Sequence, residues 1–308
     1  MRTRNVWIAL LLLALGVGAC GPAPTPISAL PDGLYIPPSC IDYMLRPGED
    51  ELVQAAIVRV GREEPQPTGV VKSWWASQVQ LVDEAGRAVS PSHIDVSEGP
   101  ATDSYRMLTL VMHIPNLETG KHIFNTLRLV DGQGAVYEYN IGEWVFNVFD
   151  EPVSEGLKVG RQSWVTEARP GPILDAELTN LTDGEVTVGD LRMGQGAGAC
   201  GTTCTLGRVF ADWSDSSSEL RAQDRTRLAP GQTKTFSFFC APQEGREAPE
   251  FIAFRPLLSF TGTGGAQQQI LLRQSIYTVF VTSDEQVLAD AARGKPVRVY
   301  RQEDASQP

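Results

Sequence analysis

The sequence is short of basic residues, of histidines and of helical patterning. Its 308 residues contain 26 Lys and Arg against 37 Asp and Glu, which gives a net charge of −11. A chain of this charge repels phosphate backbones, so we expect no nucleic-acid partner. The sequence contains no Gly-x-Ser-x-Gly motif and no glycine-rich nucleotide-binding loop. We therefore expect a protein that is not an enzyme and that carries no cofactor.

Long apolar runs are also absent, except at the N-terminus. Arg2 and Arg4 precede an apolar run over residues 6–15, and small residues then lead to Cys20. The run is shorter than the roughly 20 residues that a membrane-spanning helix needs. A positive start, a short apolar stretch and small residues together are typical of a secretory signal peptide. We predict that residues 1–19 form this signal peptide.

The residues Val17–Cys20 resemble the lipobox of bacterial lipoproteins. The resemblance implies that Cys20 receives a diacylglyceryl group, that the signal is cut in front of it, and that the new amine is acylated, with palmitate for example. Several acyl chains anchor a protein stably, whereas one chain binds a membrane only marginally. The anchor would hold the protein on the bacterial cell membrane or the outer membrane, facing outside the cytoplasm. The alternative is an ordinary signal peptide with a chance cysteine.

A proline-rich segment follows the lipobox over residues 20–32. It contains the alternating prolines Pro22, Pro24 and Pro26. Such chain favours the extended polyproline II conformation, with about 3.1 Å per residue. We predict a tether that holds the first folded domain away from the membrane.

Beyond residue 33 the chain has the pattern of β-strands. Apolar and polar residues alternate, and glycine, proline and Asp-Gly signals interrupt the alternation. In residues 105–114, for example, Leu108, Leu110, Met112 and Ile114 fall on one face. Helical periodicity is almost absent before residue 284, so the sequence predicts an all-β fold.

A strand–turn–long strand pattern occurs twice. It covers residues 127–130 and 135–149 in the first instance, and residues 257–260 and 267–281 in the second. Each hairpin closes a block of about 120 residues, which is the length of one β-sandwich. Two sandwiches in tandem are the expected architecture.

We place the two blocks at residues 33–151 and 152–282, and their turn spacing resembles that of immunoglobulin-like domains. Trp75 stands about where that fold has its buried strand-C tryptophan, and residues 118–124 resemble the corner before strand F. The resemblance implies two immunoglobulin-like β-sandwiches. This fold is widespread and implies no particular chemistry.

Five cysteines occur in the chain. With Cys20 lipidated, an even number remains, Cys40, Cys200, Cys204 and Cys240, which predicts two disulfides in an exported protein. Loop-closure entropy favours a bridge from Cys240 to Cys200 or Cys204, with Cys40 joined to the remaining one. The alternative pairs Cys200 with Cys204 and Cys40 with Cys240. Every complete pairing joins the two blocks.

A metal or redox site is the competing interpretation of these residues. Cys200 and Cys204 form a CxxxC segment that resembles the one in copper-delivery proteins related to thioredoxin. His113 and His122 face each other if their strands form one hairpin, and copper accepts imidazole ligands. If the strands lie in different sheets, His122 instead caps backbone groups at a corner. We favour structural disulfides and expect no metal.

Trp74 is the one candidate for an exposed binding surface. Alternation over residues 70–82 places it on the polar face of a strand, and exposed tryptophans often mark contact surfaces. The alternative is that Trp74 packs under a loop or under the second sandwich.

Residues 283–308 are the only part with a helical pattern. Ser283 begins a capping box, and a narrow apolar stripe with Val287 and Leu288 follows before Gly294. A helix of about ten residues is too short to persist alone in water. We expect residues 284–300 to pack on the second sandwich or to recruit a partner, and the rest to be a polar tail.

Together these features predict a lipid-anchored protein that binds or scaffolds through its β-sandwiches, without enzymatic activity. Its partners would be the membrane, through the anchor, and another envelope protein or envelope component. The alternative function is copper binding or thiol redox chemistry in the envelope, through the CxxxC segment and the histidines.

Overall fold

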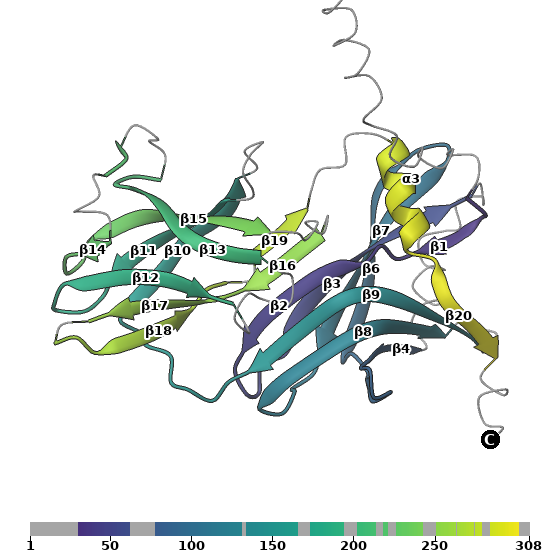
Figure 1. Cartoon of the computed structure of the whole chain (residues 1–308), viewed down its shortest axis with the longest axis horizontal. Coiled ribbons are helices and arrows are strands. Elements are labelled where there is room, and N and C mark those ends of the chain that lie inside the picture. The colour runs from purple at the N-terminus through teal and green to yellow at the C-terminus, as the bar shows by residue number, and fades with distance from the viewer. Residues whose placement is uncertain are drawn as a thin grey trace, which may run out of the picture.

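The computed structural model describes eleven stretches of the chain, among which β-strands predominate (Figure 1). These stretches are residues 30–61, 78–130, 134–165, 173–193, 202–213, 218–220, 226–242, 251–262, 264–273, 275–278 and 284–301.

The first sandwich has a smaller sheet of antiparallel strands in the order β1-β3-β7-β6. These strands are β1 (Gly33–Tyr35), β3 (Glu51–Val60), β6 (His93–Ala101) and β7 (Tyr105–Ile114). As predicted, the apolar positions of β7 face the core: Leu108, Leu110, Met112 and Ile114 are buried. Alternate side chains of a strand point to opposite faces, so one face of β7 packs inward while the other stays partly exposed.

The facing sheet has the order β19-β16-β2-β9-β8-β4-β5, and β20 pairs with β9 beside this path. Its strands are β2 (Ser39–Leu45), β4 (Gln78–Val82), β5 (Ala88–Val89), β8 (Gly120–Val130), β9 (Ala135–Val148), β16 (Phe251–Arg255), β19 (Ser275–Thr278) and β20 (Pro296–Arg301). Strand β2 pairs in parallel with both β9 and β16, and it is buried along its whole length. Parallel strands are typically covered on both faces.

The second sandwich consists of two further sheets, β10-β11-β15-β13 and β14-β12-β17-β18. Its core is rich in phenylalanine, and Phe236, Phe238 and Phe260 are fully buried. The strands are β10 (Leu157–Val165), β11 (Ile173–Asn180), β12 (Val186–Arg192), β13 (Thr202–Phe210), β14 (Arg227–Leu228), β15 (Thr233–Pro242), β17 (Leu257–Thr261) and β18 (Gln267–Leu271). The all-β class with two immunoglobulin-like sandwiches in tandem is therefore confirmed.

The two predicted hairpins behave differently. β8 and β9 form the first one as expected. In the second, β17 pairs with β18, but the expected long strand over residues 267–281 is wrong because β18 ends at Leu271. The chain then resumes as β19, which pairs with β16 in the large sheet of the first sandwich.

Strands β2 and β16 lie between the two hydrophobic cores. In β16, Ala253 belongs to the core of the first sandwich, whereas the next residue, Phe254, belongs to the core of the second. In β2, Ile41 belongs to the core of the first sandwich and Cys40 to the core of the second. Because adjacent side chains of a strand point to opposite faces, one sheet serves both cores and joins the sandwiches.

The C-terminal segment docks on the first sandwich, so the expectation that it packs on the second is wrong. α3 (Asp284–Arg293) lies beside β1 and β3, and β20 continues along β9 (Figure 1). The apolar stripe of α3 meets an apolar patch on the outer side of the smaller sheet. The cluster comprises Tyr35, Val58, Val60, Tyr105, Val287, Leu288 and Ala291.

Candidate binding cleft at the end of the first sandwich

A cleft of about 490 Å³ opens where the first and the last described strands of the chain meet. Its walls come from residues 31–35, from the adjoining ends of β8 and β9, and from Lys295 and Pro296 in front of β20. We call it the tyrosine cleft, because Tyr35, Tyr137 and Tyr139 line it. Aromatic walls with a few polar groups are typical of ligand sites.

Hydrogen bonds fix the tyrosines of the cleft. The hydroxyl of Tyr35 donates to the carbonyl oxygen of Pro31 at 2.7 Å, and that of Tyr139 donates to the carbonyl oxygen of Leu34 at 3.4 Å. Burial raises the pKa of both phenols, and the charge of Asp32 raises the pKa of Tyr35 further. Both side chains therefore stay neutral at physiological pH. They are only 4% and 2% exposed and form the floor of the cleft, whereas Tyr137 is partly exposed.

The rim of the tyrosine cleft carries charges of both signs. Asp32 and Lys295 line it and are exposed. A ligand in the cleft would thus meet aromatic walls, one carboxylate and one ammonium group. This combination suits recognition of an apolar or aromatic group attached to a charged chain, and it contains no nucleophile paired with a base.

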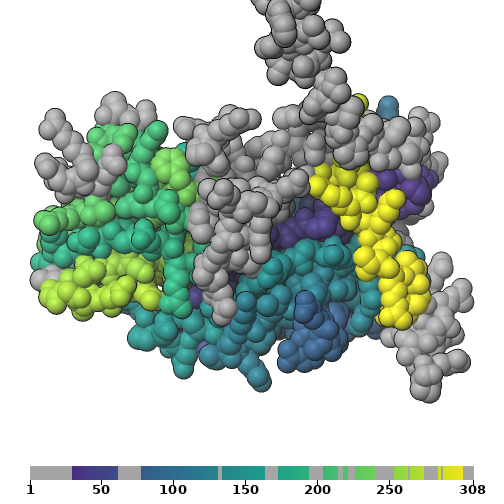
Figure 2. Space-filling model, viewed as in Figure 1, coloured from purple at the N-terminus to yellow at the C-terminus, as the bar shows by residue number. Residues whose placement is uncertain are grey.

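β20 forms one side of this region and is an edge strand. Within the described residues it pairs with β9 alone, with Val299 opposite Tyr137 and Arg298 opposite Glu138. Val297 and Val299 are 67% and 55% exposed, which makes them two of the three exposed large hydrophobic residues of the described chain. Figure 2 shows this segment on the surface of the first sandwich.

A polar row on the outer face of the sheet holds β20 in position. The guanidinium of Arg128 donates to Glu138 Oε1 at 2.8 Å and 3.0 Å, and the hydroxyl of Tyr300 donates to the same oxygen at 3.1 Å. The guanidinium of Arg298 stacks 4.6 Å from the centre of the Tyr300 ring. β20 is thus anchored on the β9 side, and no other described strand pairs with its second edge.

A second depression of about 730 Å³ lies between the β4–β5 turn and strands β8 and β9. Charged side chains line it, among them Asp83, Arg87, Lys121 and Glu143. Arg87 already forms an ion pair with Asp83 at 2.7 Å. This depression lacks the aromatic walls of the tyrosine cleft.

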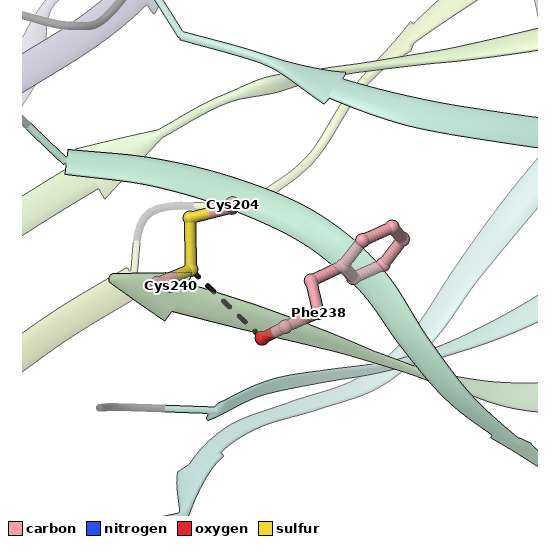
Figure 3. Close-up of a disulfide and its surroundings, with 3 residues drawn as sticks. All are labelled: Cys204, Phe238 and Cys240. Atoms are coloured by element: carbon pink, nitrogen blue, oxygen red, sulfur yellow. Dashed lines mark hydrogen bonds between the residues drawn. A yellow bond between two sulfur atoms is a disulfide. The ribbon is translucent and has the colours of Figure 1, made fainter. Parts of the chain in front are cut away.

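The predicted cysteine residues are in disulfides wherever the structure describes them. Cys204 on β13 and Cys240 on β15 lie directly opposite each other and are bridged (Figure 3). This confirms the expected bridge from Cys240 to the CxxxC segment. Cys40 is also disulfide-bonded. Cys20 and Cys200 lie outside the described residues.

The two histidines that might have formed a site are separated. His113 and His122 lie on β7 and β8, which belong to different sheets, so they do not face each other. His122 Nε2 instead lies 2.7 Å from the carbonyl oxygen of Glu118, as expected for a corner residue. His113 faces His93, with ring centres 5.6 Å apart. No group of three or more His, Cys, Asp or Glu residues suited to a metal ion occurs in the described stretches.

Trp74 lies outside the described residues, so its proposed role as a binding surface stays a prediction. The tyrosine cleft was not predicted from the sequence, because its residues come from three distant parts of the chain. One signal was present: Tyr137 and Tyr139 alternate within one strand and so share a face.

No helix in the described parts of the chain is long and apolar enough to cross a membrane.

The chain resembles known proteins only distantly. No family model and no curated protein matches the sequence. Among solved structures, the chain is similar to the periplasmic chaperone SfaE, with 13% identity over 80% of this chain and 100% of that one, at a TM-score of 0.20. It is also similar to the Enterococcus faecalis MSCRAMM ACE, which binds its ligands by the collagen hug model, with 8% identity over 82% and 95%, at a TM-score of 0.23.

Proposed function

We propose that the protein is a lipid-anchored, extracytoplasmic binding protein without enzymatic activity, and that the tyrosine cleft is its binding site. The cleft is the observation that carries this proposal. It is the only described region that combines a cavity, fixed aromatic walls and an exposed apolar strand alongside. Exposed apolar surface next to a rim of polar residues is typical of interaction sites.

The bonded state of the cysteines supports a location outside the cytoplasm. A disulfide between Cys204 and Cys240, and the bonded state of Cys40, fit an oxidising compartment outside the cytoplasm. The signal peptide and the lipobox-like residues Val17–Cys20 add the anchor. The bridge at Cys204 leaves no CxxxC dithiol for the alternative redox function. The partner would be another envelope protein or an envelope component.

Site-specific photo-crosslinking in the living bacterium tests this function. A photoreactive amino acid replaces Tyr137 in the cleft or, as a control, Leu181, which is 58% exposed on the second sandwich. We expect a discrete adduct of higher mass from position 137 and none from position 181. Identical adduct patterns at both positions, or no adduct at position 137, would contradict the proposed site.

A further inference from the structure

The free edge of β20 has the features of a strand-addition site. Backbone N–H and C=O groups on an edge strand are a template for pairing with another extended chain. Proteins commonly protect such edges by covering them or with prolines, charges and bulges. β20 has Pro296, Arg298 and a register shift between them, but it leaves Val297 and Val299 exposed. Residues 296–301 pair with β9 on one side only within the described chain. An incoming strand would therefore extend the large sheet of the first sandwich by one strand.

The charge of this edge is opposite to that of the protein. Lys295 and Arg298 are exposed, and neither forms an ion pair within the described residues. Two carboxylates of this region are occupied: Glu138 accepts from Arg128 and Tyr300, and Asp290 is paired with Arg293 at 2.6 Å. Asp32 lines the cleft together with Lys295. A basic strip on a chain with a net charge of −11 favours a negatively charged occupant.

We propose that β20 pairs with an extended, acidic segment of a partner protein, in which apolar residues alternate with Glu or Asp. This inference rests on the proposed function and specifies its partner. The incoming apolar side chains pack on Val299 and its neighbours, and the acidic ones lie near Lys295 and Arg298. Because Lys295 and Pro296 also line the tyrosine cleft, one end of the segment reaches the cleft mouth and inserts an apolar side chain there.

A second copy of this chain is a poor occupant of the same edge. Pairing two β20 strands would bring their basic residues together, and like charges opposite each other destabilise a strand pair. The charge pattern therefore selects a different, acidic chain.

Synthetic peptides as long as β20 test the inference on the full-length, lipid-free Cys20→Ser protein by fluorescence anisotropy at low salt. One peptide alternates Val with Glu, a second alternates Val with Lys, and a third is the acidic peptide with alternate amide nitrogens methylated on the pairing edge. We expect the acidic peptide to bind, the basic one to bind at least about tenfold more weakly, and the methylated one to lose binding, because its N–H donors are gone.

The variant Lys295→Gln/Arg298→Gln provides the matched control, since it removes both charges without placing a carboxylate opposite Glu138. It should melt like the parent protein and bind the acidic peptide about three- to tenfold more weakly. The inference would be overturned if the acidic peptide does not bind, if it binds no better than the basic one, or if methylation leaves its binding unchanged. A dimer that depends on β20, seen in sedimentation, would also overturn it. If crosslinking from position 137 succeeds while the peptides fail, only this inference falls and the proposed function stands.

Discussion

The backbone of Gly294 lies directly against the backbone of Ile36. The amide of Ile36 donates to the carbonyl oxygen of Gly294 at 2.9 Å, and a β-carbon on Gly294 would lie 2.4 Å from the carbonyl carbon of Ile36. Gly294 stands between α3 and β20, and Ile36 follows β1. This contact therefore fastens the C-terminal segment to the first strand of the chain.

Gly294→Ala should destabilise the protein by about 1–3 kcal/mol, because the new methyl group must displace backbone rather than a flexible side chain. A lower melting temperature in calorimetry would show it. Gly33→Ala is the matched control, since its β-carbon would meet only the Tyr35 ring, at 3.8 Å. Equal melting temperatures for the two variants would refute the close contact.

Truncation after Thr282 should lower the melting temperature, because it uncovers the buried residues Tyr35, Val58 and Tyr105. It also removes the hydrogen bond from the Tyr105 hydroxyl to Asp284, which is 2.9 Å long. Truncation after Arg301 removes only the tail and should leave thermal unfolding unchanged. If both truncations melt like the full chain, the docked C-terminal segment contributes nothing to stability.

Arg255→Gln should weaken the junction of the two sandwiches in a pH-dependent way. Arg255 on β16 donates to Glu49 at 2.7 Å and to Glu51 at 2.6 Å, and the side chains of Arg255 and Glu51 are only 15% and 13% exposed. Burial raises the pKa of Glu51, and the charge of Arg255 opposes that shift. A carboxyl group with a raised folded-state pKa favours the folded state at low pH, and this contribution is lost as the pH rises through that pKa.

Without Arg255, the pKa of Glu51 should rise further, so the variant loses most stability at neutral and alkaline pH. We expect a loss of about 1–3 kcal/mol at pH 8 and a smaller loss toward pH 4, measured by denaturant unfolding. Arg106→Gln removes a more exposed ion pair with Glu98 and should cost less than about 1 kcal/mol at either pH. If Arg255→Gln lowers the free energy of unfolding equally at both pH values, the proposed role of the buried Arg255–Glu51 pair is contradicted.

Peptide mapping without reduction should find Cys40 joined to Cys200. Cys40 is disulfide-bonded, Cys204 and Cys240 are bonded to each other, and a lipidated Cys20 has no free thiol. The bridge would tie β2 to the chain segment in front of β13. A Cys20–Cys40 peptide would contradict both this pairing and lipidation.

Lipidation itself predicts that the mature protein begins at Cys20 and partitions into detergent. Cys20→Ser should release the protein from the membrane fraction, because the acyl chains supply the membrane affinity. Mass spectrometry of the mature N-terminus checks the modification directly. Equal membrane retention of wild type and variant would refute the anchor.

Local sequence patterns predicted the strands well. The alternation in residues 105–114 defines β7, and the capping box and stripe define α3 to within a residue. These patterns are local consequences of which face of an element is buried. A bridge from Cys240 to the CxxxC segment also followed from the entropy of loop closure, but that argument did not choose between Cys200 and Cys204.

The same local patterns did not predict where these elements lie in the fold. The apolar stripe of α3 requires a buried surface but does not specify which sandwich supplies it. Likewise, β16 is apolar on both faces, and the sequence does not show that Ala253 faces one core and Phe254 the other. The tyrosine cleft depends on such long-range placements, because residues 31–35 meet Lys295 only after α3 has docked.

The position of β20 has a consequence for the order in which the protein folds. The chain leaves the first sandwich after β9, builds the second sandwich, and returns to add β16, β19, α3 and β20 to the first. Domains usually fold one after another as the chain emerges, starting from the N-terminus. Here the N-terminal sandwich stays incomplete until nearly the last residue has emerged, because β2 still lacks its partner β16 and β9 still lacks its partner β20. A chain that stalls before residue 251 would therefore expose unpaired strand edges of the first sandwich, even though residues 33–148 had all emerged.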